Sequence, residues 1–215
     1  MKIGILGTGM VGTALGAKLV NVGNQVMMGS RSAANEKAVE WAKANGSSAS
    51  HGTFADAAAF GKIIFNCTSG TGSIAALKSA GEKNLNGKIL IDVANPLDFS
   101  KGMPPTLFVC NTDSLGEQIQ REFPGVDVVK TLNTVNCNVM VHPSLVPGEH
   151  DLFLCGNNEE AKSHVTDLLK NWFGWQSIID LGDITNARAM EMLLPIWIRL
   201  WGKLGTANFN YKIVR

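Results

Sequence analysis

The sequence predicts an α/β protein built on a doubly wound, mostly parallel β-sheet with helices on both faces. Two observations lead to this prediction. Apolar runs of strand length alternate with segments of helical periodicity through most of the 215 residues. The runs are continuously apolar, as in strands that are covered on both faces. A strand–helix–strand alternation of this kind is typical of parallel sheets.

Seven apolar runs are expected to form the strands of this sheet. They are Lys2–Leu6, Gln25–Gly29, Ile63–Cys67, Lys88–Val93, Val126–Thr131, Leu152–Cys155 and Ser177–Asp180. Two segments outside these runs carry a clear apolar stripe at helical spacing. One stripe consists of Val11, Leu15, Leu19 and Val22, and the other of Ala161, Val165, Leu168, Leu169 and Trp172.

The chain is long enough for one large domain, and no second domain of any size is visible. We expect residues 1–182 to form the α/β domain and residues 183–215 to be a short helical C-terminal extension packed on it. One helix is expected from Asp183, its cap, to about Leu204, with a kink at Pro195.

Two further segments carry weaker signals. The tail Asn208–Arg215 alternates apolar and polar residues, so we expect it to add an edge strand or to contact a partner. The segment Asn95–Pro105 holds three prolines and is expected to be irregular and to run over the surface.

Composition excludes several classes of protein. Hydrophobic residues make up 45% of the chain and charged residues 17%, which is typical of a globular protein. The net charge of +1 comes without a basic stripe, which argues against nucleic-acid binding. The apolar run Leu193–Trp201 is shorter than the roughly 20 residues that a membrane span needs.

The cysteines indicate neither a metal site nor a disulfide framework. Cys67, Cys110, Cys137 and Cys155 are far apart, form no CxxC pair and have no histidine cluster near them. Free thiols, together with an N-terminus that does not resemble a secretory signal, favour a cytoplasmic location.

A glycine motif follows the first expected strand and opens the first expected helix. Its six residues are Gly7, Thr8, Gly9, Met10, Val11 and Gly12. In a strand–turn–helix context the GxGxxG spacing has a physical reason. The first glycine permits the tight turn, the second lets the backbone approach a pyrophosphate, and the third lets helix and strand pack closely. The motif therefore predicts a dinucleotide-binding domain of Rossmann type, although a glycine-rich turn without a ligand is the alternative.

The end of the second expected strand predicts which dinucleotide is bound. A site for NAD places an acidic residue here, which accepts hydrogen bonds from the adenosine ribose. This chain has Ser30 and Arg31 instead. A guanidinium can donate two parallel hydrogen bonds to a 2′-phosphate, and Lys37 in the next helix can add positive charge. We therefore expect NADP(H); the alternative is that Ser30 only caps the next helix and Arg31 is solvated.

Polar loops follow three more strands at the edge where the carboxyl ends of parallel strands meet. They contain Thr68 and Ser69, then Ala94, Asn95 and Pro96, and then Asn133 to Asn136. Ligands of doubly wound sheets bind at this edge, next to the point where the strand order reverses. A cleft is therefore expected here, although Asn95 and Asn136 are equally compatible with a structural role in turns.

Taken together, these segments resemble the family of coenzyme F-420:NADP oxidoreductases. The resemblance covers nearly the whole chain, and the same domain is similar to the NADPH-binding domain of the STEAP metalloreductases. It rests on the glycine motif, Gly29–Arg31, Asp92–Leu97, Lys130–Val135, Phe153–Asn157, Asp180–Gly182 and Ala187–Glu191.

The resemblance implies hydride transfer between NADPH and a deazaflavin (coenzyme F-420) or a flavin-like acceptor stacked against the nicotinamide. It also implies that Thr8, Ser30 and Arg31 contact the 2′-phosphate. The loops at Thr68–Ser69, Asn95–Pro96 and Asn133–Val135 would wall the nicotinamide. No general acid or base stands out, which suits transfer between two bound ring systems, where alignment supplies most of the rate enhancement.

Two other functions stay open on the sequence alone. One is reduction of a small carbonyl or imine compound, as in pyrroline-5-carboxylate or β-hydroxyacid reductases, although those carry a larger helical C-terminal domain. The other is a non-catalytic NADPH-sensing module. His142 and His150 are expected to be surface or packing residues. The apolar face from Met190 to Trp201 is large, and it predicts a homodimer.

Overall fold

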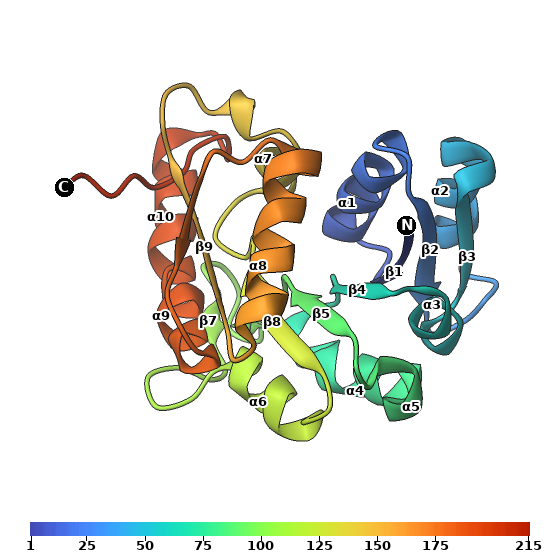
Figure 1. Ribbon diagram of the computed structural model, residues 1–215. Helices are drawn as coiled ribbons and strands as arrows, with labels where there is room; N and C mark the ends of the chain where they lie inside the picture. Colours follow the sequence, from blue (N-terminus) through green and yellow to red (C-terminus); the bar gives the residue numbers. More distant parts are fainter.

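A computed structural model describes all residues, 1–215. Eight strands form one sheet in the order β10-β9-β8-β5-β4-β1-β2-β3, and two short strands form a separate hairpin (Figure 1). The strands of the sheet are β1 (Lys2–Leu6), β2 (Gln25–Ser30), β3 (Ala49–Thr53), β4 (Ile63–Asn66), β5 (Ile89–Asp92), β8 (Asp127–Thr131), β9 (Asp151–Gly156) and β10 (Ser177–Asp180). The hairpin strands are β6 (Leu97–Asp98) and β7 (Thr106–Leu107).

Helices connect the strands and cover both faces of the sheet (Figure 1). They are α1 (Met10–Asn21), α2 (Glu36–Asn45), α3 (Phe54–Phe60), α4 (Gly70–Ala80), α5 (Glu82–Leu85), α6 (Leu115–Glu122), α7 (Cys137–Val141), α8 (Glu159–Leu168), α9 (Ala187–Met192) and α10 (Leu194–Leu204). None of them combines the length and the apolar composition that crossing a membrane requires.

The pairing of the strands confirms the predicted Rossmann-type, doubly wound sheet. Strand β1 pairs in parallel with β2 on one side and with β4 on the other. The chain therefore builds outward from β1 in both directions, and this reversal point is where such sheets bind ligands. One pair departs from the parallel pattern, because β9 runs antiparallel to β8 while β10 is again parallel to β9.

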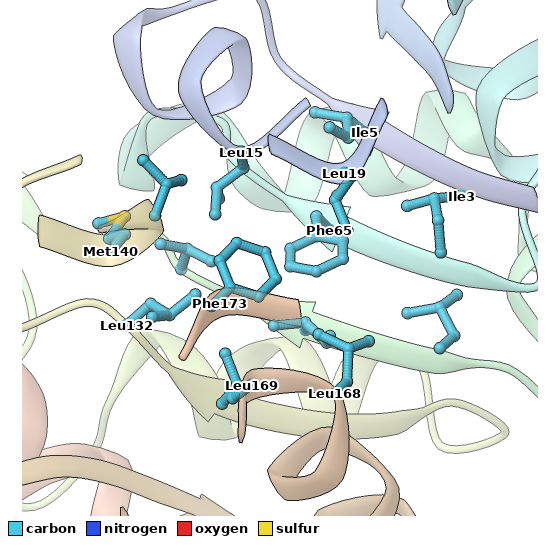
Figure 2. Packing of buried hydrophobic residues seen from close by; sticks show 14 of the residues in the cluster. Ile3, Ile5, Leu15, Leu19, Phe65, Leu132, Met140, Leu168, Leu169 and Phe173 are labelled. Atoms are coloured by element: carbon cyan, nitrogen blue, oxygen red, sulfur yellow. The ribbon is translucent and has the colours of Figure 1, made fainter. Parts of the chain in front are cut away.

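Two hydrophobic clusters, one on each face, hold the helices to the sheet. The first packs α1, α7 and α8 on β1 and β4, and Figure 2 shows Leu15, Phe65 and Phe173 meeting within it. The second packs α3 to α6 and α9 on the opposite face. The predicted stripes are mostly buried: Leu15 and Leu19 are fully covered, whereas Val22 is exposed. Burial on both faces explains why the central strands are continuously apolar.

The expected strands form with boundaries shifted by one residue or none, but two structures were missed. Strand β3 has the sequence Ala-Ser-His-Gly-Thr, and only Gly52 in it is buried. It lies at the edge of the sheet, so it carries no apolar signal. The segment expected to be irregular, Asn95–Pro105, contributes β6 of the hairpin.

The C-terminal extension differs from the prediction of one kinked helix. Asp183 accepts a hydrogen bond from the Thr185 N–H, as a cap does, but it caps only a short 3-10 turn. Helix α9 follows and ends before Leu193, and α10 then begins with Pro195 in its first turn. Proline is favoured in a first turn, because its missing N–H is not needed there. The proline therefore separates two helices instead of bending one.

The tail forms no strand, so the first of the two alternatives predicted for it, an edge strand, is wrong. It is nevertheless attached to the sheet at the start of β9. The Asp151 N–H donates to the Tyr211 carbonyl (2.9 Å), and its carboxylate accepts from the Ile213 N–H (2.6 Å). The Asn210 side chain donates to the Asp151 carbonyl (2.9 Å).

Candidate active site

A cavity of about 470 Å³ lies at the carboxyl ends of β1, β2 and β4. We call it the larger cavity. It contains seven residues that the sequence singled out: Gly7, Thr8, Gly9, Ser30, Arg31, Thr68 and Ser69. The sequence did not single out the remaining lining residues, which are Asn35, Phe54, Cys67, Gly72, Ala75, Ala76 and Ser79. Most of these lie on helices whose amphipathic pattern gave no reason to choose them.

The glycine motif forms the floor of the larger cavity. Gly7 has φ +121°, and a Cβ there would lie 2.6 Å from the Cys67 carbonyl oxygen. A Cβ on Gly12 would lie 2.2 Å from the Gly7 carbonyl oxygen, so this glycine lets α1 pack on the turn. Gly9 is different, because a Cβ there would meet nothing within 4 Å. Packing within the chain does not require glycine at this position, and no side chain caps the helix end that follows it.

The end of β2 carries Ser30 and Arg31 to the cavity wall. The Ser30 hydroxyl donates to the Ser32 carbonyl (2.6 Å), so it forms a local turn. Asn35, not Ser30, caps α2 by accepting from the Ala38 N–H. The alternative that Ser30 caps this helix is therefore wrong. Arg31 is exposed and pairs with no carboxylate of the chain, whereas Lys37 is exposed on α2 and does not line the larger cavity.

A second cavity of about 240 Å³, the smaller cavity, adjoins the first. The two share Cys67, Thr68 and Ser69. Its other lining residues are Val11, Gly70, Thr71, Val93, Ala94, Asn95, Leu97 and Phe99. The loops after β4 and β5 meet closely here, because a Cβ on Gly70 would lie 2.0 Å from the Asn95 carbonyl oxygen. The two cavities adjoin each other along the reversal point of the sheet, and we refer to them together as the cleft.

Six of the predicted site residues line neither cavity: Lys37, described above, and five others. Met10 is 80% exposed at the start of α1, and Gly12 is buried within α1. Pro96 follows the lining residue Asn95, and Asn133 and Val135 are buried behind the loop. Asn133 positions the lining residue Asn95 through two hydrogen bonds. The Asn133 side chain donates to the Asn95 side chain (2.9 Å), and the Asn133 carbonyl accepts from the Asn95 side chain (2.9 Å).

A buried ion cluster that the sequence reading missed lies behind the smaller cavity. The Lys130 ammonium lies 2.8 Å from a carboxylate oxygen of Asp92 and 2.8 Å from one of Glu191. All three side chains are at most 2% exposed. Burial disfavours the charged form of Lys130, but the two carboxylates outweigh this effect and raise its pKa above the ordinary value. Glu191 also accepts from the N–H groups of Leu115 and Gly116 at the start of α6.

The ion cluster holds both loops of the smaller cavity. Lys130 donates to the Ala94 carbonyl (2.5 Å), which fixes the loop after β5. Asp92 accepts from the Asn66 side chain (2.8 Å), and Asn66 in turn accepts from the Thr68 hydroxyl (2.7 Å). A lysine within an apolar strand was the signal for this cluster in the sequence. The cluster therefore positions residues that line the cleft without reaching the cleft itself.

The histidines and Asn136 lie outside the cleft. His150 donates through Nε2 to the Pro143 carbonyl and packs edge-on against Trp175. His142 is exposed after α7, and Asn136 caps α7 by accepting from the Asn138 N–H. No group of three or more histidine, cysteine or acidic side chains is arranged to hold a metal ion.

Comparison with known proteins agrees with this geometry. The family described as NADP oxidoreductase coenzyme F420-dependent matches residues 2–96. The F420-dependent NADP reductase of Methanocaldococcus jannaschii is 32% identical over 223 residues, which cover 99% of this chain and 94% of that protein. A crystal structure of a candidate F420-dependent NADP reductase from Arthrobacter sp. FB24 is 53% identical and covers 100% of both chains with a TM-score of 0.95.

A more distant relative shares only part of its length. Metalloreductase STEAP3 of Rattus norvegicus is 27% identical over 200 residues, which cover 91% of this chain but 38% of that protein. The similarity to the reductase of Methanocaldococcus jannaschii extends over both chains almost completely. The chain therefore belongs to the F420-dependent NADP reductases, a family of oxidoreductases.

Proposed function

We propose that the protein transfers hydride between NADP(H) and a deazaflavin, coenzyme F420, or a similar flavin-like acceptor. The observation that carries this proposal is the cleft of two adjoining cavities at the reversal point of the sheet. Its larger cavity combines an open glycine position at Gly9 with an unpaired guanidinium at Arg31. Its smaller cavity adjoins it through Thr68 and Ser69 and has a mostly apolar wall.

The larger cavity fits the adenosine and phosphate half of NADP(H). The N-terminus of α1 presents free N–H groups and the positive end of the helix dipole to the pyrophosphate, with Gly9 allowing close approach. Arg31, Ser30 and Thr8 are the residues that we propose for the 2′-phosphate. No acidic side chain lines this cavity, which suits a phosphorylated ribose better than a ribose with two free hydroxyls.

The smaller cavity fits the nicotinamide and the reacting edge of the acceptor. NADPH supplies a hydride, which carries two electrons and one proton, and solvent supplies the second proton that the acceptor takes up. Val11, Val93 and Ala94 provide an apolar wall that excludes water, and Asn95 and Thr68 orient the ring. The ion cluster behind them, with Asn133 and Val135, keeps these loops in place.

The side chains of the smaller cavity favour this reaction over reduction of a carbonyl or imine. The latter benefits from a protein acid that protonates the substrate. The smaller cavity contains no histidine, lysine or carboxylate. Its one titratable group is Cys67, and burial raises the pKa of this thiol far above its ordinary value. Transfer between two ring systems needs no such acid.

The proposed function is tested by mixing the protein with NADPH and coenzyme F420 and following the absorbance of both compounds. Oxidation of NADPH with matching reduction of F420, and little reaction with NADH, is the expected result. FMN and FAD in place of F420 show whether a flavin is accepted. Tight binding of NADPH without turnover of any of these acceptors would instead favour a sensing module and contradict the proposal.

We also infer that the protein is a homodimer through α10. Only Leu194 of the eleven residues of this helix is buried. Ile196, Trp201 and Leu204 are each at least 45% exposed. Large apolar side chains at this density on one helix are unusual on a free surface and typical of an interface.

A further inference from the structure

The hairpin β6–β7 is anchored directly beside the proposed nicotinamide position. It begins two residues after Asn95, and the Phe108 N–H closes its base by donating to the Pro96 carbonyl (2.9 Å). The same base touches the start of α4, where a Cβ on Gly70 would lie 3.0 Å from the Pro96 Cα. The hairpin is a separate two-stranded sheet, and its strand β6 contacts α4. The hairpin base is therefore fixed relative to the cleft.

Phe99, directly after β6, is the one aromatic side chain that lines the smaller cavity. It is 57% exposed, so it stands at the mouth of the cavity and not in its floor. The other apolar lining residues, Val11, Val93, Ala94 and Leu97, are aliphatic. Leaving a phenyl ring in water is unfavourable, and neither hydrophobic cluster of the core includes Phe99. The fold gives no reason for an aromatic ring at this position.

Hydride transfer restricts where an acceptor can lie. Its reacting atom must come within about 3–3.5 Å of the nicotinamide. With the nicotinamide against the loops after β4 and β5, the acceptor has to enter from the open side of the smaller cavity, which is where Phe99 stands. A phenyl ring offers a flat apolar face, which suits a fused planar ring system better than a small carbonyl compound.

We propose that Phe99 determines acceptor specificity by stacking against the fused ring of a planar heterocyclic acceptor at the mouth of the smaller cavity. This inference rests on the proposed function and adds to it the residue that selects the acceptor. Met103 is a matched control, because it lies on the same hairpin and is 63% exposed but does not line the smaller cavity.

The experiment compares Phe99→Ala, Phe99→Trp and Met103→Ala with the unaltered protein, using NADPH with coenzyme F420 or FMN as acceptor. In Phe99→Ala the KM for the acceptor is expected to rise about tenfold, as typical of a lost stacking partner, with kcat little changed. The Kd for NADPH, followed by nicotinamide fluorescence, is expected to stay within about twofold. Phe99→Trp is expected to restore the KM, and Met103→Ala to leave it unaltered.

Two outcomes would overturn the inference, and they differ from failure of the proposed function. One is a Phe99→Ala variant with the KM of the unaltered protein for both acceptors. The other is an equal rise in Phe99→Ala and Met103→Ala, which would indicate a general disturbance of the hairpin. If the unaltered protein oxidises NADPH with neither acceptor, the proposed function fails first and this inference fails with it. Because Phe99 is exposed, its replacement leaves the core intact.

Discussion

The ammonium group of Lys130 lies 2.8 Å from the carboxylate of Asp92, and neither side chain reaches solvent. Two strands that neighbour each other in the sheet, β5 and β8, are thus joined by a buried ion pair as well as by their backbone ladder. The pair is balanced by Glu191 from α9 and connects to both loops of the smaller cavity. Stability and the shape of the cleft therefore depend on the same three side chains.

Replacing Lys130 by methionine is expected to lower the free energy of unfolding by about 3–5 kcal/mol, because it leaves two buried carboxylates without their partner. The control is Lys78→Met, which removes the exposed pair with Glu122 and is expected to cost at most about 1 kcal/mol. Urea denaturation measures both values. Equal losses in the two variants would contradict the role assigned to the buried cluster.

Substitutions at Gly9 and Gly12 are expected to have different effects. Alanine at Gly9 should weaken NADPH binding, and alanine at Gly12 should lower the stability of the fold. In Gly9→Ala the free energy of unfolding should change by less than about 0.5 kcal/mol, since the new methyl group meets no atom of the chain. NADPH affinity should fall roughly tenfold or more, because the methyl group blocks the approach of the pyrophosphate.

Gly12→Ala is the matched variant. Its Cβ would lie 2.2 Å from the Gly7 carbonyl oxygen, so it is expected to destabilise the fold by about 1–3 kcal/mol. Thermal unfolding and NADPH titration of both variants provide the measurement. Normal NADPH binding by Gly9→Ala would remove the main support for a pyrophosphate at this turn.

Arg31→Ala is expected to weaken NADPH binding by about 1.5–3 kcal/mol, the range of a hydrogen bond to a charged group. Binding of NADH should hardly change, because NADH lacks the 2′-phosphate. Lys37→Ala should cost less than about 0.5 kcal/mol, since this side chain is exposed outside the larger cavity. Isothermal titration calorimetry with both nucleotides measures these affinities. An equal loss of affinity for NADPH and NADH would show that Arg31 does not contact the 2′-phosphate.

The tail 208–215 is expected to detach from the start of β9 in acid, because its attachment depends on the charged form of Asp151. Burial would raise the pKa of this carboxyl, but the Ile213 N–H, Ser177 and Lys212 outweigh it and hold the pKa below its ordinary value of about 3.9. A group with a lowered folded-state pKa contributes stability above its unfolded-state pKa. This contribution is therefore lost as the pH falls below about 3.9 towards the lowered value.

Hydrogen exchange of the C-terminal peptide, corrected for the intrinsic rate at each pH, measures this detachment. Protection should fall over that pH interval in the unaltered protein. Asp151→Asn should show weak protection at every pH, whereas Asp183→Asn, altered at an exposed carboxylate, should behave like the unaltered protein. A pH profile that Asp151→Asn leaves unchanged would assign the effect to another group.

Sedimentation should show a dimer at micromolar concentration that Trp201→Glu converts to a monomer. A charge in an apolar interface is costly to bury. Val39→Glu, at an exposed apolar side chain on α2, should remain a dimer. A monomer for the unaltered protein would exclude the proposed interface.

Features whose geometry is set by residues adjacent in the chain could be predicted from the sequence. The turn at Gly7 to Gly12 and the end of β2 at Arg31 could be read from the chain, because adjacent residues create their geometry. The edge strand β3 could not, since pairing with β2 alone makes it a strand. Glu191 could not be linked to Lys130 either, because 60 residues separate positions that only the folded chain brings within 2.8 Å.

The lining of the cleft was predicted in the same uneven way. Residues at strand ends, such as Thr68 and Asn95, lie where the rule for parallel sheets expects them. Asn133 also follows a strand end, but Asn95 covers it. This covering results from the packing of two loops, which the sequence does not show. Phe99 was missed because it belongs to a hairpin that prolines had marked as irregular.

The reversal of β9 has a practical consequence for handling the protein. Because β9 is antiparallel to β8, the first residue of β9 lies on the same side of the sheet as the carboxyl ends of the parallel strands, where the cleft is. The tail attached to this residue lies on that side too. Met1 precedes β1 and lies at the opposite edge. An affinity tag or a surface tether joined to Met1 would leave the mouth of the cleft free. The same attachment at Arg215 would instead load the tail that hydrogen bonds to Asp151 hold to the start of β9.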